Sequence, residues 1–471
     1  MTSEVKKDEQ IIKCRDDIQP VYFKKIHETG SIKNEFILVE GSSCSWTTAD
    51  NTFNQDTLRS RIEPWLTSLF QSEHLSLLIG SGLTHAIHQM ATNETLPGMN
   101  TVSFDIFNEE IQKEAKRTAS TSGRKGGNIE DQIRVANECL RGLEIFASTK
   151  PEDLPVHLHY KKLRTSLNRV LDDFTASILA GENGIVSADE KCREVAFNYL
   201  VSFLMSFASR TGTRDRLHIF TTNYDRCIEA GADIAGLRLI DRFIGTLNPI
   251  FRSSRLDVDM HYNPPGIRGE PRYLEGIARF TKLHGSIDWV DCNQTIQRIG
   301  LPFGAESIDP YLNAPGLKGI GSMQLMVYPN SSKDQETALY PYVELFRDFA
   351  AATCRPNSTL VCYGYSFGDE HINRVIKDML TIPSAHLVVI ARGDSLSRIK
   401  KLYEELGRSA QITLLIGDHL GDLQTLVDHY LPKPAIDKTT FRMAKLLQNR
   451  YGSETGNVTI NKPDEQGEQM P

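Results

Sequence analysis

Seven short apolar segments, several of them followed by a helical pattern, constrain the fold of this chain more than any other feature. They read HLSLLIG, LHIFTTN, RFTKLHG, MQLMVYP, TLVCYGY, HLVVIA and ITLLIG, and each is long enough for one buried strand. Segments such as DEHINRVIKDML and SLSRIKKLYEEL have helical spacing instead. Strands that alternate with helices predict an α/β fold with a Rossmann-like, doubly wound and mostly parallel sheet.

A long helical segment interrupts this alternation between about residues 104 and 211. The stretches HLHYKKLRTSLNRVLDDFTASILAG and SADEKCREVAFNYLVSFLMSFASR both carry apolar residues at helical spacing. We therefore expect a helical subdomain inserted into an α/β domain that spans residues 56–435.

The two ends of the chain are expected to lie outside this domain. Residues 1–55 are polar and predict an N-terminal extension, in which YFKKIH and EFILVE could pair as a small hairpin. Residues 436–451 are expected to form a C-terminal helix. Residues 452–471 have almost no large apolar side chains and are expected to be disordered.

Charge and cysteine spacing argue against several functional classes. The 53 basic and 60 acidic residues give a net charge of −7, so no broad positive field predicts nucleic acid as the main ligand. The eight cysteines form no C-x-x-C pair, so we expect reduced thiols and no metal site. The sequence shows no signal peptide and no run near the roughly 18 apolar residues of a membrane span. A cytoplasmic protein is therefore expected.

Four of the predicted strands end in glycine or polar residues. These are Gly80-Ser81-Gly82-Leu83-Thr84, Thr222-Asn223-Tyr224-Asp225, Lys282-Leu283-His284-Gly285-Ser286 and the turn from Gly364 to His371. Each has an ordinary explanation, because glycines make turns, Asn, Asp and Ser cap helices, and a lone histidine is often structural. Ligands of open α/β sheets bind beyond the carboxyl ends of the strands, so four such motifs on one edge favour a binding site.

The residue types indicate what each motif could do. The glycines of the first motif let the backbone approach a phosphate at a helix N-terminus. Histidine titrates near neutral pH, which makes His284 a candidate for proton transfer. The hydroxyl of Ser366 and the carboxylate of Asp369 could bind ribose hydroxyls.

The order of these motifs, G-x-G-x-[ST], T-N-Y-D, K-L-H-G-S and G-Y-S-F-G-D, resembles the sirtuin-like NAD-consuming domains of prokaryotic antiphage defence proteins. The resemblance is closest to the sirtuin-like subunit encoded beside a HerA-type hexameric ATPase. It runs from about Leu75 to Ile416, and further matching stretches are Asn128–Asp131, Val327–Pro329 and Asp369–Asn373.

The resemblance implies roles for individual residues. Asn223 would orient the nicotinamide ribose and an attacking water, and His284 would be the general base. Asp225 would belong to the dinucleotide site and orient Asn223, or it would simply cap its helix. The remaining binding residues would be Gly80, Ser81, Gly82 and Thr84 at the phosphates, and Gly364, Ser366 and Asp369 at the adenosine half.

The resemblance implies an NAD+ hydrolase that releases nicotinamide and ADP-ribose and depletes NAD+ during phage infection. NAD+ would be the substrate, no metal would be needed, and the chain would form a homo-oligomer and bind a HerA-type hexameric ATPase. The paired C-x-x-C zinc module and the G-I-P-D-F-R segment of sirtuin deacetylases are missing, which favours hydrolysis over deacylation.

Two other classes of function stay open. The chain could be a sensor that binds NAD+ or ADP-ribose without cleaving it, or a scaffold subunit of a defence complex. The presence of both Asn223 and His284 favours catalysis. Cyclisation as an alternative to hydrolysis, and NADP+ as an alternative to NAD+, also stay open.

Overall fold

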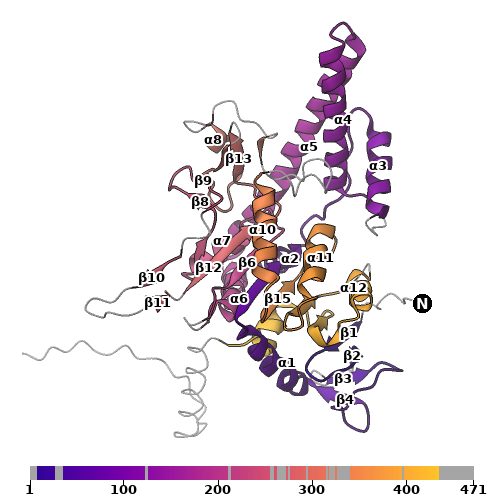
Figure 1. The fold of residues 1–471 in the computed structure, drawn as a ribbon, viewed down its shortest axis with the longest axis vertical. Coiled ribbons are helices and arrows are strands. Elements are labelled where there is room, and N and C mark those ends of the chain that lie inside the picture. Colours follow the sequence, from indigo (N-terminus) through magenta and orange to yellow (C-terminus); the bar gives the residue numbers. More distant parts are fainter. Residues whose placement is uncertain are drawn as a thin grey trace, which may run out of the picture. The chain divides into compact units, whose positions relative to one another are not determined.

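Seven parallel strands form the centre of a sheet that has eleven strands in the described part of the chain (Figure 1). Their order across the sheet is β17-β16-β15-β5-β6-β12-β7. The bounds are β5 His74–Ile79, β6 His218–Thr221, β7 Arg238–Ile240, β12 Ile277–Lys282, β15 Ser358–Tyr363, β16 His386–Ala391 and β17 Ile412–Ile416. Almost every residue of the central strands is buried, as expected when helices cover both faces of a parallel sheet. The predicted α/β, doubly wound fold is confirmed.

The structure is a computed structural model that describes most of the chain before residue 434. The described residues are 8–26, 35–121, 126–210, 214–254, 259–262, 272–273, 276–292, 295–313, 317, 324–325, 340–394 and 397–433. The chain divides into two units, Met1–Pro432 and Lys433–Pro471. The predicted C-terminal helix, the predicted tail and the matching stretch Val327–Pro329 all lie outside the described residues.

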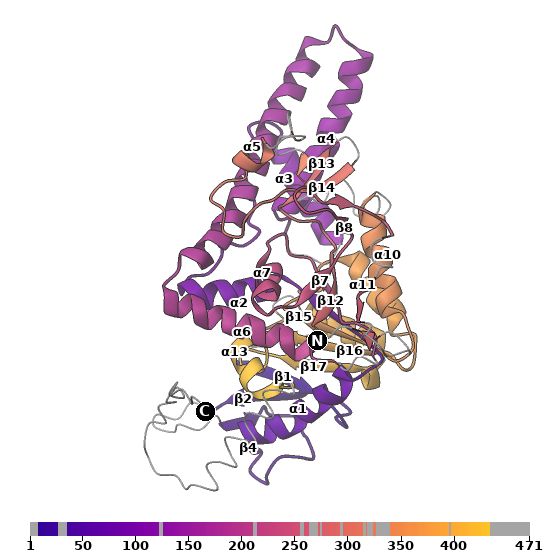
Figure 2. The same ribbon diagram turned by 90° about the vertical axis from the view of Figure 1, so that its left-hand side faces the viewer.

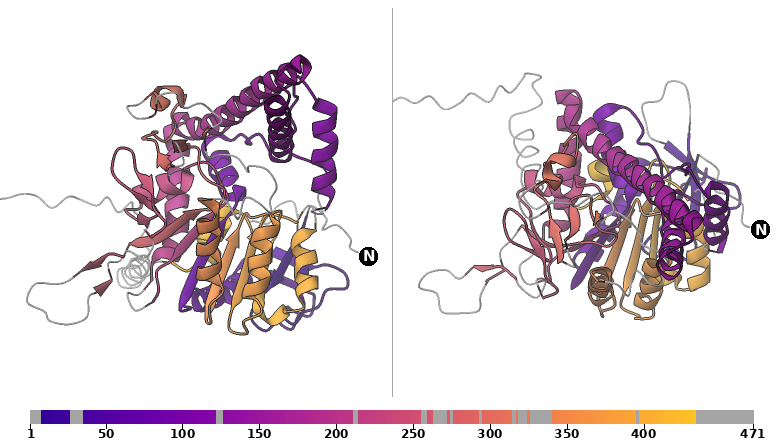
Figure 3. Two further views of the ribbon diagram at one scale, coloured as in Figure 1. Left: turned by 45° about the horizontal axis from the view of Figure 1, so that its top comes forward. Right: turned by 90° about the horizontal axis from the view of Figure 1, so that it is seen from above.

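Helices cover both faces of the sheet (Figure 3). The first layer consists of α1 (Gln55–Phe70), α2 (Ser81–Thr92), α6 (Glu190–Ala208) and α7 (Cys227–Ile234), which share one hydrophobic cluster. The other holds α10 (Tyr342–Thr353), α11 (Glu370–Met379) and α12 (Arg398–Leu406). In β15, Val361 and Tyr363 join the first cluster while Leu360 and Cys362 join the second, because successive side chains of a strand point to opposite faces.

The strand order reverses beside β5. From β5 the chain continues to β6, β7 and β12 on one side, with β12 lying between β6 and β7, whereas β15, β16 and β17 extend the sheet on the other side. The loops after β5 and β15 therefore leave in different directions and open a crevice at their carboxyl ends, which is the usual ligand position in this fold.

The described residues 8–26 and 35–54 add four strands to the sheet and are not a separate extension. The strands β1 (Glu9–Lys13), β2 (Val21–Lys25), β3 (Glu35–Leu38) and β4 (Thr52–Asn54) continue it in antiparallel order, with β1 paired to β17. The expected hairpin is the pair β2 and β3. Phe23 and Phe36 are fully buried in the hydrophobic core. The segment therefore contributes to the core, although its average composition is polar.

The expected helical insertion is present and has two parts. The helices α3 (Asn108–Thr121), α4 (Ile129–Thr149) and α5 (Leu154–Ser187) share a third hydrophobic cluster, and Figure 2 shows α4 and α5 projecting side by side. Helix α6, by contrast, packs on the sheet. The insertion thus both covers the sheet and adds a projecting pair of helices.

Small elements complete the described chain. A four-stranded antiparallel sheet has the order β13-β14-β9-β8, and β10 pairs with β11. Their bounds are β8 Phe243–Ile244, β9 Ile250–Phe251, β10 His261–Tyr262, β11 Arg272–Tyr273, β13 Trp289–Cys292 and β14 Thr295–Arg298. Short helical segments are α8 Asp309–Leu312, a 3-10 turn at Ser409–Gln411, α13 Leu423–Thr425 and a π-helical turn at Leu426–Tyr430. Of the segment MQLMVYP, the structure describes Gln324 and Leu325, and Leu325 forms an isolated antiparallel bridge to Val290.

Candidate active site

The glycine turns after β5 and β15 pack against each other at the reversal of strand order. The amide of Gly82 donates to the carbonyl of Gly364 over 3.1 Å. A Cβ atom on Gly82 would lie 2.6 Å from the Cα atom of Gly364, and Gly364 itself has a φ of +61°. Both positions therefore require glycine. Gly82 was expected to line the phosphates, but it faces Gly364 and is not part of the cavity wall.

Asn223 follows β6 and is held by its amide group. Its Nδ2 atom donates to the carbonyl of Gly80 over 3.1 Å and to Oγ1 of Thr84 over 3.0 Å. The residue is 6% exposed and lies in the wall of the cavity. Because both amide hydrogens are directed into the protein, the carbonyl oxygen is the end of the side chain that a ligand can use.

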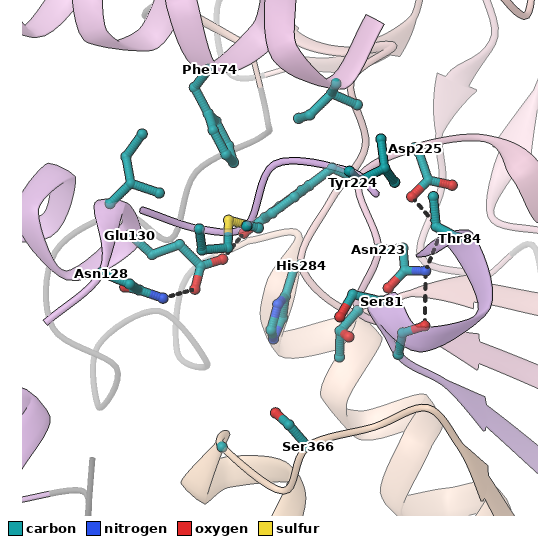
Figure 4. Close-up of a pocket in the computed structure, with 18 of the residues that line it drawn as sticks. Ser81, Thr84, Asn128, Glu130, Phe174, Asn223, Tyr224, Asp225, His284 and Ser366 are labelled. Carbon is teal, nitrogen blue, oxygen red and sulfur yellow. Dashed lines mark hydrogen bonds between the residues drawn. The ribbon is translucent and has the colours of Figure 1, made fainter. Parts of the chain in front are cut away.

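Thr84 and Asp225 fix the orientation of Asn223 (Figure 4). Thr84 Oγ1 donates to Asp225 Oδ2 over 2.8 Å, so its lone pairs face the amide of Asn223. The other oxygen of Asp225 accepts from the backbone of Cys227 in the first turn of α7. Asp225 therefore both accepts from the first amide of α7, one residue before the N-cap Arg226, and orients Asn223 through Thr84. Thr84, which was expected at the phosphates, makes these two bonds and also lines the cavity.

Lys282, the last residue of β12, supports the loop that carries Asn223. Its Nζ atom donates to the carbonyls of Tyr224 and Asp225 and to Glu229 Oε1 over 3.0 Å. The lysine side chain is 1% exposed. Burial raises the pKa of Glu229, and the positive charge of Lys282 opposes this shift. The lysine of the K-L-H-G-S motif thus binds two backbone carbonyls of the T-N-Y-D motif.

Replacing Lys282 with methionine is expected to destabilise the protein by about 3 kcal/mol, because it leaves the carboxylate of Glu229 and two carbonyls without their buried donor. The midpoint of denaturant unfolding measures the loss. The double variant K282M/E229Q should recover part of it, since it removes the uncompensated charge. A loss below about 1 kcal/mol in K282M would contradict the role assigned to the lysine.

His284 pairs with Asp369 across the cavity floor. The distance from His284 Nε2 to Asp369 Oδ2 is 2.8 Å, and the other carboxylate oxygen accepts from the backbone of His371 and Ile372 at the start of α11. Asp369 was expected to hold the adenosine half of the ligand. Both its oxygens accept from donors of the protein, so Asp369 is the partner of His284; because Asp369 also lines the cavity, its contact with the adenosine half stays a prediction.

A cavity of about 870 Å³ joins these groups. Ser81, Gly364 and Ser366 line it, together with Gly80, Asn223 and His284. The helical insertion supplies a further part of the wall, which includes Asn128, Glu130 and Phe174. Asn128 and Glu130 had been noted only as part of a matching stretch, because no local pattern shows that α4 begins opposite the sheet edge.

A buried ion pair fixes the insertion against this site. Arg226, beside α7, binds the carboxylate of Glu182 in α5 and the carbonyls of Leu301 and Pro302. Burial raises the pKa of Glu182, and the guanidinium opposes the shift. Helix α5 is therefore tied directly to the loop that carries the candidate catalytic asparagine.

The two ends of the cavity differ in charge. Arg398 donates to the carbonyl of Ser366 and lies at the end formed by the turn after β15. Glu130 lies at the start of α4, and Figure 4 shows His284 between Glu130 and Ser366. One end therefore favours an anionic group and the other a cationic or hydrogen-donating group.

A comparison with protein families bears directly on this arrangement. Residues 217–413 match the family described as SIR2-like domain. The matched region includes Asn223, His284 and Asp369, and the match indicates a function related to NAD. A search of curated proteins found none that matches the chain.

Two other features are absent from the described residues. No group of three or more histidine, cysteine, aspartate or glutamate side chains is arranged there to hold a metal ion. None of the helices in these ranges is both long enough and apolar enough to span a membrane.

Proposed function

We propose that the chain is an NAD+ hydrolase that cleaves the bond between nicotinamide and ribose and releases nicotinamide and ADP-ribose. One observation carries the proposal. The fixed amide of Asn223 and the paired imidazole of His284 line the same cavity, at the carboxyl ends of the neighbouring strands β6 and β12.

The charges of the cavity suggest how NAD+ would bind. Its diphosphate would lie near Ser81 at the N-terminus of α2 and within reach of Arg398, where backbone amides and a guanidinium favour negative charge. The adenosine half would follow the turn that contains Gly364 and Ser366. The positively charged nicotinamide ring would then point toward Glu130 and Tyr224.

In this proposal the protein positions water and moves one proton. The carbonyl oxygen of Asn223 accepts a hydrogen bond from a ribose hydroxyl or from the attacking water. As the water oxygen bonds to C1′, the bond from C1′ to the nicotinamide nitrogen breaks and its electron pair neutralises the ring. His284 takes the proton of the water, and Asp369 stabilises the imidazolium.

We further propose that this activity serves antiphage defence by depleting NAD+ in infected cells. The support is the resemblance of the motifs, which also implies a homo-oligomer and a HerA-type hexameric ATPase as partner. Uncontrolled cleavage of NAD+ would poison the producing cell, so the proposal includes restraint by assembly or by an infection signal.

The test is to incubate the purified chain with NAD+, alone and with the product of the neighbouring gene, and to follow nicotinamide by chromatography. We expect release of nicotinamide with ADP-ribose in equal amount. Release only with the partner present would make assembly the switch. Binding of NAD+ without release in either case would overturn the hydrolase proposal and favour a sensor.

A further inference from the structure

Helix α4 and the T-N-Y-D loop meet in the cavity through a pair of residues that the proposed proton transfer does not use. The hydroxyl of Tyr224 donates to Glu130 Oε1 over 2.8 Å, and Nδ2 of Asn128 lies 3.4 Å from the other carboxylate oxygen. All three residues line the cavity, as does Phe174, whose ring meets that of Tyr224 edge-on at 5.8 Å (Figure 4).

The position of Glu130 is built into the start of α4. Asn128 accepts from the amide of Asp131, and Asp131 accepts in return from the amide of Asn128, which forms a capping box. Glu130 lies in the first turn of this helix, where the helix dipole favours a carboxylate. The capping box fixes the backbone of Glu130, and Tyr224 fixes its carboxylate. This hydrogen-bond acceptor therefore has a defined position in the cavity.

We propose that Glu130, held by Tyr224, binds the carboxamide of the nicotinamide ring and selects dinucleotides that carry this amide against those that carry nicotinic acid. This inference rests on the proposed function. An amide N–H donates to a carboxylate in a charge-assisted hydrogen bond. A nicotinic acid carboxylate at the same place would face a second negative charge and could not donate.

The neighbours of Glu130 fit the rest of the ring. Tyr224 follows Asn223 directly, so the ring subsite adjoins the amide that would hold the ribose. The Tyr224 ring lies 6.3 Å from that of His284, centroid to centroid, and Phe174 adds a second aromatic wall. A flat ring next to the reacting C1′ atom would thus lie between aromatic surfaces, with its amide toward Glu130.

The experiment compares NAD+ with nicotinic acid adenine dinucleotide on the purified full chain, by binding calorimetry and by release of the free base. We expect the wild type to bind NAD+ at least about 10-fold more tightly, the ratio that one charge-assisted hydrogen bond supports. The variant E130Q should bind the two dinucleotides within about 3-fold of each other. Y224F, which keeps the ring but frees the carboxylate, should fall between them.

The control is E144Q, an exposed position on the same helix, which should keep the wild-type preference. An unchanged preference in E130Q, or equal binding of both dinucleotides by the wild type, would overturn the subsite even if NAD+ is cleaved. A wild type that cleaves neither dinucleotide, but prefers NAD+ in binding and loses that preference in E130Q, would support the subsite while the hydrolase proposal fails.

Discussion

Replacing Asn223 with alanine is expected to lower the rate of NAD+ cleavage about 100- to 1,000-fold, the usual cost of removing one preorganised polar group from a catalytic site. The side chain is fixed by Gly80 and Thr84, so its carbonyl oxygen faces the cavity without having to reorient when substrate binds. Nicotinamide release at saturating NAD+ measures the effect.

Two further variants make this result specific. T84V should also lower the rate, though less, because it removes the hydroxyl that links the amide to Asp225 and leaves Asn223 in place. N313A changes an exposed asparagine outside the cavity wall and should leave the rate unchanged. If N223A kept more than half of the wild-type rate, the assignment of Asn223 would have to be abandoned.

Replacing His284 with alanine is expected to lower the rate about 100- to 10,000-fold, because the attacking water loses its general base. D369N should approach the same loss. Asparagine still caps α11 with its oxygen. Its amide nitrogen, however, cannot accept the hydrogen bond that His284 Nε2 donates to Asp369 in the wild type. The imidazole would then be held in the wrong tautomer.

The pH profile separates this positioning role from a structural one. In D369N the dependence of rate on pH should be displaced from that of the wild type, whereas a variant that only weakened the helix cap would keep it. E370Q, an exposed neighbour in the same turn, serves as the matched control and should keep both rate and profile. A D369N enzyme with wild-type rate and profile would show that Asp369 acts as a cap alone.

The local pattern of the sequence was sufficient to predict the α/β class and the four motifs at strand ends. Buried strands are short apolar runs, and β5, β6, β12, β15, β16 and β17 each contain one. The carboxyl ends of parallel strands lie at one edge of the sheet. The four motifs could therefore be predicted to lie close together, although the hydrogen-bond partners of their side chains were not known. The hairpin of β2 and β3 was expected, but its place in the main sheet was not, because the pairing of β1 with β17 joins distant parts of the chain.

The roles inside the site depend on contacts between distant parts of the chain, and only the tertiary structure decides these. Asp369 lies 85 residues from His284, Tyr224 lies 94 residues from Glu130, and Asp225 lies 141 residues from Thr84. Periodicity and capping preferences reach only a few residues, so they could not show that Thr84 contacts Asn223 or that Asp369 contacts His284, and they gave Glu130 no role. The sequence by itself therefore determined which strands end in reactive groups, while packing determined which of those groups face the cavity and which hold them there.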